Sequence, residues 1–281
     1  MGPSALRIAG ITQTIEELGY TVRETGTVTA GGFETTDHGE SKTRFLDEIV
    51  EVARRVGAMV GKALADGCLP LILGGDHSLS AGSVGAVAHH FRALGGSIGV
   101  IWVDAHADMN RPETTPSGNI HGMSLAVLLG HGHARLLELF ADTPAVRAEN
   151  VSVLGARDLD PGEKALLSEL GIRVFTMSEI DERGVAVCME EALQRANDGT
   201  TGFHLSFDLD ALDPRVAPGV GTPVQGGLTY REGHLVCEKA VCSGKLLSLE
   251  FVELNPVLDD RNHTAQLAVG LVASALGKSI L

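Results

Sequence analysis

The sequence is poor in aromatic residues and in positive charge. Phe, Trp and Tyr make up 4% of its 281 residues, which is little for a surface that stacks on nucleic-acid bases. There are 22 Lys and Arg residues against 36 Asp and Glu residues, a formal net charge of −14, and this balance argues against a nucleic-acid partner. Acidic residues favour solubility, and clustered aspartates would also suit cations and a cationic substrate.

Cysteines and long apolar runs are scarce as well. No two of the cysteines form the C-x-x-C pair of a zinc ribbon or redox motif; they are Cys68, Cys188, Cys237 and Cys242. Scattered thiols in a chain without a signal peptide are typical of the reducing cytoplasm. No apolar run reaches the roughly 18 residues of a membrane span. We therefore expect a cytoplasmic protein with no membrane partner.

Hydrophobic residues, at 44%, and glycine, with 35 residues, are abundant. Helices are expected from Pro3 to about Gly19 and over residues 41–65. Strands are expected at residues 69–73, 97–103, 150–154, 202–207 and 245–249. Nearly continuous apolar strands that alternate with helices indicate an α/β fold, with a mostly parallel central sheet and helices on both faces. No linker or repeat interrupts the pattern, so residues 1–281 are predicted to form one domain.

Asp104, His106 and Asp108 follow the second expected strand. In an extended segment, alternate residues point to one side, so two carboxylates and an imidazole would converge. The alternative is a polar strand end whose acids cap the next helix. That alternative explains one aspartate but not three metal-type ligands in register, so a metal site is favoured.

Two further strand ends carry the same residue types. Asp208 and Asp210 follow the fourth expected strand, although turn residues such as Asp213 also lie there. His77 follows the first strand after two glycines, and its position favours ligation over a structural role. Asp76 is interpreted as a turn residue or a partner of a ligand. The carboxyl ends of parallel strands share one edge, where active sites of such sheets lie.

The candidate ligands are four carboxylates and two imidazoles: His77, Asp104, His106, Asp108, Asp208 and Asp210. Oxygen donors outnumber nitrogens and no thiolate is present, which favours manganese over zinc or copper. Six side chains are too many for one catalytic ion with an open position, and they suit two ions that share carboxylates. The residues themselves thus predict a two-metal hydrolase.

Three motifs resemble the signatures of the ureohydrolase family, which includes arginases and agmatinases. They are Gly74-Gly75-Asp76-His77, Asp104-Ala105-His106-Ala107-Asp108 and the segment from Ser206 to Pro214. The resemblance covers nearly the whole chain. It implies the three-layer arginase/deacetylase-like α/β fold and two Mn²⁺ per chain. It also implies that a metal-bridging hydroxide attacks the guanidinium carbon of the substrate.

Within that family, the loop after Asp108 resembles the one in the arginase branch. The resemblance implies that Asn110, Thr115 and Ser117 hold the α-carboxylate of L-arginine. Without it, an ordinary polar loop would be the preferred interpretation. Asp160 matches a residue near the substrate α-amino group and Glu163 a further acid there, although a first-turn helix charge explains Glu163 nearly as well.

The resemblance assigns three more residues to the reacting end of the substrate. Thr222 and Glu253 match residues that line the guanidinium end, where a carboxylate is the expected partner. His121 matches the proton-shuttling histidine, as suits a side chain that titrates near neutrality. Asp108 and His121 would assist proton transfer to the leaving amine, and ornithine and urea would depart.

Family members usually have a strand and a glycine-rich loop before the segment with which this chain begins. The resemblance therefore predicts a sheet without that N-terminal strand. It also implies a homo-oligomer, either a trimer or a hexamer.

Three alternatives remain open. An agmatinase or guanidino-acid hydrolase would share the metal ligands and differ in the carboxylate-binding loop. A zinc deacetylase of the same fold class would hold one metal ion. A metal-dependent binding or regulatory protein would keep the ligands and lose His121 or Glu253, yet both are present.

Overall fold

A computed structural model describes residues 1–32, 35–139 and 143–279. Six parallel strands form one sheet in the order β1-β6-β5-β2-β3-β4. The strands are β1 (Leu71–Leu73), β2 (Ile98–Val103), β3 (Val151–Ala156), β4 (Arg173–Thr176), β5 (Gly202–Asp208) and β6 (Leu246–Val252). Every residue of β2, β3 and β5 is buried, because helices cover both faces of the sheet.

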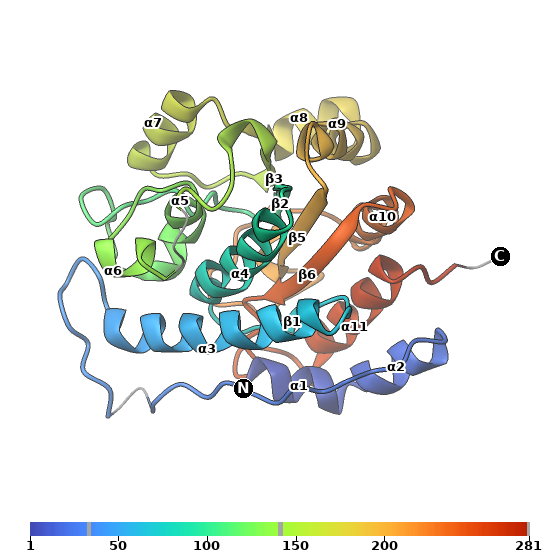
Figure 1. The fold of residues 1–281 in the computed structure, drawn as a ribbon. Coiled ribbons are helices and arrows are strands. Elements are labelled where there is room, and N and C mark those ends of the chain that lie inside the picture. The colour runs from blue at the N-terminus through green and yellow to red at the C-terminus, as the bar shows by residue number, and fades with distance from the viewer. Residues whose placement is uncertain (33–34, 140–142, 280–281) are drawn as a thin grey trace.

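Helices cover the two faces in two groups (Figure 1). One group packs around Trp102 of β2 and comprises α3 (Leu46–Ala65), α4 (Ser80–Ala93), α5 (Ser124–Leu128) and α7 (Pro161–Leu170), with α6 (Ala134–Leu137) beside it. The other packs around Phe207 of β5 and comprises α1 (Gly2–Ile8), α2 (Ile11–Glu17), α8 (Met177–Arg183), α9 (Val185–Asn197), α10 (Tyr230–Cys242) and α11 (His263–Ala275). The predicted α/β class, with a parallel sheet and helices on both faces, is confirmed.

The structure differs from the sequence-based expectation near the N-terminus. The helix expected up to Gly19 is two helices, because Gly10 adopts a left-handed φ of 86° between α1 and α2. The helix expected from residue 41 begins only at Leu46, after Phe45 at φ 60°. Among the described residues β1 and β4 are the two edge strands of the sheet.

Four short 3₁₀ turns, η1 (His77–Leu79), η2 (Ile120–Met123), η3 (Ala148–Asn150) and η4 (Leu209–Ala211), complete the described elements. Three of them lie next to predicted site residues. Within the described residues no helix is both long and apolar enough to span a bilayer.

Candidate metal centre and substrate site

The candidate ligands gather where β1, β2 and β5 end. Because the strands are parallel, their carboxyl ends lie at one edge of the sheet. His77 begins η1 after β1, Asp104 directly follows β2, and Asp208 is the last residue of β5. Rigid, buried strands therefore position side chains that are far apart in the sequence.

His77 is surrounded by three carboxylates. Its Nδ1 lies 3.4 Å from Asp104 Oδ2, 3.1 Å from Asp108 Oδ2 and 3.1 Å from Asp208 Oδ2. This nitrogen is buried and makes no well-directed hydrogen bond within the described part of the chain. A buried nitrogen that faces carboxylate oxygens without such a bond is well suited to bind a cation.

A second group forms around His106. Its Nδ1 lies 3.4 Å from Asp104 Oδ1 and 3.2 Å from Asp210 Oδ2. The two groups, His77 with Asp104 and Asp208, and His106 with Asp104 and Asp210, each have ligand atoms within 4.8 Å of one another. Asp104 contributes one oxygen to each group, so the structure brings the six candidates together as two adjoining sites.

The local geometry is not the extended one expected from the alternation of residues. β2 ends at Val103, and the chain then turns, with Asp108 at a left-handed φ of 52°. Asp210 lies in η4, and its N–H donates to Asp208 Oδ1 at 2.8 Å. The prediction of one continuous pleat was therefore wrong, and tight turns produce the convergence instead. A left-handed non-glycine residue costs about 1–3 kcal/mol, which the surrounding contacts must offset.

The crowded carboxylates stabilise positive charge in their neighbourhood, as the pKa values of the site show. Burial lowers the pKa of His106, but Asp104 and Asp210 raise it more, to about 12. Burial and the charge of Asp104 raise the pKa of Asp108 to about 7, against the influence of His77. Divalent cations would supply this charge and replace the protons on the imidazoles. The donor set, with more carboxylate oxygens than nitrogens, fits hard ions such as manganese.

Sequence reasoning missed two residues that support the ligands. The buried Trp102 ring stacks on His77 with a centroid separation of 4.1 Å, and its Nε1 donates to Asp104 Oδ2 at 2.9 Å. Arg157 donates to backbone carbonyls on both sides of the site, including Asp210 O at 2.7 Å and Val224 O at 2.8 Å. A lone tryptophan just before a candidate ligand was the available signal for Trp102. An arginine after an apolar strand gave no specific signal.

His121 and Glu253 form a third group beside the first. His121 Nδ1 lies 3.3 Å from Glu253 Oε1, which also accepts the His77 N–H at 2.7 Å. Burial lowers the pKa of His121, but Glu253 and the charges of Asp76 and Asp108 raise it to about 9. His121 is therefore protonated near neutral pH when the site has no cation.

The predicted substrate loop is internally hydrogen-bonded. Asn110 Nδ2 donates to Asp160 Oδ2 at 2.8 Å, so these two predicted residues touch. The Thr115 hydroxyl accepts the Gly118 N–H at 2.9 Å, and exposed Ser117 accepts the Asn119 N–H at 3.1 Å.

Two other predicted residues form hydrogen bonds with residues of the site. Glu163 is buried and accepts the N–H groups of Asp160 and Met109 at 2.8 and 3.1 Å, as part of a helix capping box. Thr222 is exposed, and its hydroxyl donates to Asp210 Oδ2 at 2.9 Å. Glu163 thus orients Asp160, and Thr222 adjoins the second ligand group.

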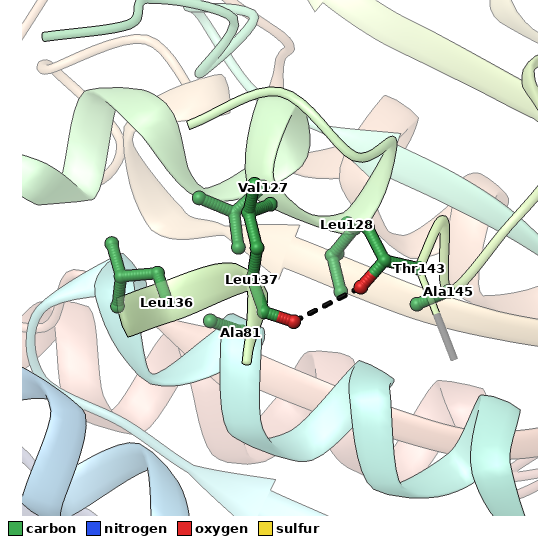
Figure 2. A pocket seen from close by; sticks show the side chains of 7 residues that line it. All are labelled: Ala81, Val127, Leu128, Leu136, Leu137, Thr143 and Ala145. Carbon is green, nitrogen blue, oxygen red and sulfur yellow. Dashed lines mark hydrogen bonds between the residues drawn. The ribbon is translucent and has the colours of Figure 1, made fainter. Parts of the chain in front are cut away.

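A hollow between α4, α5 and α6 contains none of these residues. It has a volume of about 10 Å³ and is lined mostly by apolar side chains, with Thr143 donating to Leu137 O (Figure 2). The lining residues are Ala81, Val127, Leu128, Leu136, Leu137, Thr143 and Ala145. A space this small holds about one water molecule, so it is a packing defect rather than a substrate site.

Comparison with known proteins identifies relatives along nearly the whole chain. The model of the arginase family matches residues 1–277. An arginase from Brevibacillus brevis is 48% identical over 284 residues, which cover 100% of this chain and 93% of that relative. An arginase from Bacillus caldovelox is 46% identical over 282 residues, again covering 100% and 93%.

Solved structures give the same result. The crystal structure of an arginase from Bacillus cereus superimposes with a TM-score of 0.93 at 47% identity, covering 100% of this chain and 93% of that one. The Bacillus caldovelox arginase structure gives a TM-score of 0.95 at 44% identity with the same coverage. The fold of this chain is therefore similar, over its whole length, to the folds of these arginases.

Proposed function

This chain belongs to the arginase family, and on that premise we propose that it hydrolyses L-arginine to L-ornithine and urea at two Mn²⁺ ions. The observation that carries the proposal is the pair of adjoining ligand groups that share Asp104. Residues 1–281 serve as one catalytic domain.

The two ions would be held by His77, Asp104, His106, Asp108, Asp208 and Asp210. Asp104 has an oxygen in each group and would help to hold both ions. When bound, two such ions supply Lewis-acid polarisation and activate a water molecule as a hydroxide nucleophile near neutral pH. The protein contributes fixed ligand positions, because most of these side chains are buried at strand ends.

The amino-acid end of the substrate would bind in the loop after Asp108. Asn110, Thr115 and Ser117 provide neutral donors for the α-carboxylate, and Asp160 provides a carboxylate for the α-amino group. Glu163 would position that end of the substrate indirectly, because its carboxylate accepts the backbone N–H of Asp160.

The guanidinium end would lie between Glu253 and Thr222, near the ligand groups. A carboxylate favours a planar guanidinium through charge-assisted hydrogen bonds. The position of Glu253 is fixed by the backbone N–H of His77, which donates to its Oε1. The position of Thr222 is fixed by its hydrogen bond to Asp210.

Proton transfer to the leaving amine is assigned to His121 and Asp108. The pKa of His121 is raised to about 9, against burial, by Glu253 and the charges of Asp76 and Asp108. Glu253 Oε1, 3.3 Å from His121 Nδ1, would favour the imidazolium with the ions bound as well, and the imidazolium can donate its proton as the carbon–nitrogen bond breaks. Asp108, which lies beside His77, assists this transfer.

The test compares urea release from arginine with urea release from agmatine after manganese loading. Agmatine lacks the α-carboxylate, so donors in the substrate loop would be left without a partner. We expect kcat/KM to favour arginine by about a hundredfold or more. A preference for agmatine would overturn the arginase assignment, and one zinc ion per chain by metal analysis would overturn the two-metal site.

We also propose that the enzyme is a cytoplasmic homo-oligomer, either a trimer or a hexamer. The compartment is supported by Cys68, Cys188, Cys237 and Cys242, which are all free thiols. The assembly is supported by the family to which the chain belongs. Light scattering of the purified protein would measure the number of subunits.

A further inference from the structure

A row of buried polar side chains lies between β5, β6 and α4, behind the metal ligands. His204 and Ser206 of β5 stand opposite Ser248 and Glu250 of β6 in the strand register. All four are fully buried. Because polar groups are costly to bury without partners, the hydrogen bonds of these side chains indicate which groups they position.

Glu250 is the acceptor at the centre of this row. Its Oε1 accepts the hydroxyl protons of Ser80 at 2.5 Å and Ser206 at 2.7 Å, and its Oε2 accepts that of Ser83 at 2.5 Å. Burial raises the pKa of Glu250, but the charge of His204, whose Nε2 lies 3.5 Å from Oε1, contributes to lowering it to about 2. The carboxylate is thus ionised and accepts three hydrogen bonds.

Ser206 links this carboxylate to His77. A hydroxyl has one proton, and that of Ser206 is donated to Glu250. The Ser206 oxygen, 2.8 Å from His77 Nε2, can therefore only accept from that nitrogen. His77 must carry a proton on Nε2, so Nδ1, which faces Asp104 and Asp208, is the nitrogen left to bind a cation.

We propose that Ser206, anchored by Glu250, is a positioning residue that holds His77 in the tautomer and orientation needed to bind one divalent cation. The inference rests on the metal site of the proposed function. It applies to one of the two ligand groups only, since His106 belongs to the other. Partners of this kind typically change metal affinity by about 10- to 100-fold.

Trp102 offers a spectroscopic measure of this site. It is the only tryptophan in the sequence. Its ring stacks on His77 and its Nε1 donates to Asp104. Paramagnetic Mn²⁺ bound beside it should quench its fluorescence, so binding can be followed without measuring turnover.

The experiment titrates Mn²⁺ into the metal-free parent, Ser206→Ala and Ser83→Ala, with free Mn²⁺ followed by electron paramagnetic resonance and Trp102 by fluorescence. Both substitutions remove one buried hydroxyl that donates to Glu250, but only Ser206 contacts His77. We expect two equivalents in the parent. Ser206→Ala should weaken one of them by about 10- to 100-fold, and Ser83→Ala should leave both within about threefold of the parent.

Unfolding of the metal-free proteins provides the control for stability, and the two variants should lose similar amounts. If Ser206→Ala does not fold, Ser206→Cys keeps the shape with weaker hydrogen bonds and should weaken the same equivalent. Parent-like affinity in the Ser206 variants, or equal weakening in Ser83→Ala, would overturn the inference alone. A parent that binds no Mn²⁺ would overturn both this inference and the proposed function.

Discussion

Two non-glycine residues of the site have left-handed backbones. Asp108 has φ 52° and Glu253 has φ 62°, and both are assigned to the reaction. Strain of this kind persists only where surrounding contacts hold it. The N–H of Glu253 donates to Gly75 O at 2.7 Å, which fixes this residue against the loop after β1. The side chains are thus directed by strained backbone rather than by regular strand geometry.

His121 is the residue through which the proposed proton transfer can be tested. Replacement by asparagine keeps a polar atom near the position of Nδ1 but removes the titrating group. We expect His121→Asn to lower kcat by about 10²- to 10⁴-fold, since the leaving amine then takes its proton from water. Steady-state urea release measures kcat, and metal analysis should still give the parental manganese content. A variant with unchanged kcat and raised KM would assign His121 to binding instead.

At the scale of elements, the segment before α3 braces the substrate loop. The Arg44 N–H donates to Gly118 O at 2.9 Å, and Lys42 Nζ donates to Thr115 O at 2.6 Å. Gly118 has φ 76°, and a Cβ there would lie 1.9 Å from Ser41 O. The contact is close enough that only glycine fits.

Gly118→Ala should therefore displace the loop that carries Thr115 and Ser117. We expect KM for arginine to rise by about tenfold or more, because small displacements of positioning groups are costly, while manganese binding persists. Gly122→Ala is the matched control, since a Cβ there meets nothing within 4 Å. Equal KM values for the two variants would contradict the bracing role.

The elements also show what sequence reasoning could reach. Buried parallel strands are long apolar runs, so the ends of β2 and β5, with Asp104 and Asp208, were predictable. The strand β4 was missed because it has four residues and begins with Arg173, which forms ion pairs with Glu179 and Glu191.

Contacts between distant segments account for the other differences. Residues 41–45 are not helical because the N–H groups of Arg44 and Phe45 bond to Gly118 O and His38 O. Helical periodicity carries no information about such partners. The pairing of Ser206 with Glu250 likewise depends on which strands are neighbours, although polar residues at alternate positions in both strands were a usable signal.

At the scale of the whole molecule, buried Glu250 links stability to pH. Its pKa is lowered from 4.5 to about 2 because the charge of His204 and hydrogen bonds such as that of Ser80 outweigh the effect of burial. A depressed pKa stabilises the fold fully above about pH 4.5, and this stabilisation is lost as the pH falls towards 2. A pKa shift of this size corresponds to roughly 3 kcal/mol in the free energy of unfolding.

Glu250→Gln should remove this pH-dependent part of the stability. The metal-free parent should be more stable than the variant at pH 5, and the difference should shrink by pH 3. Denaturant unfolding at both pH values measures the two free energies. A difference that stays constant would show that Glu250 does not titrate as the structure indicates.

The strand order has a consequence for how the molecule is made. Among the described residues β6 is the last strand, and it lies between β1 and β5. Since β1 pairs there with β6 alone, that pairing forms only after residues 246–252 have emerged from the ribosome. His77 follows β1, whereas Asp104 directly follows β2 and Asp208 ends β5. The first ligand group therefore comes together only after β6 has joined the sheet, and under the proposed function an ion held at His77 would mark a chain that has closed its sheet.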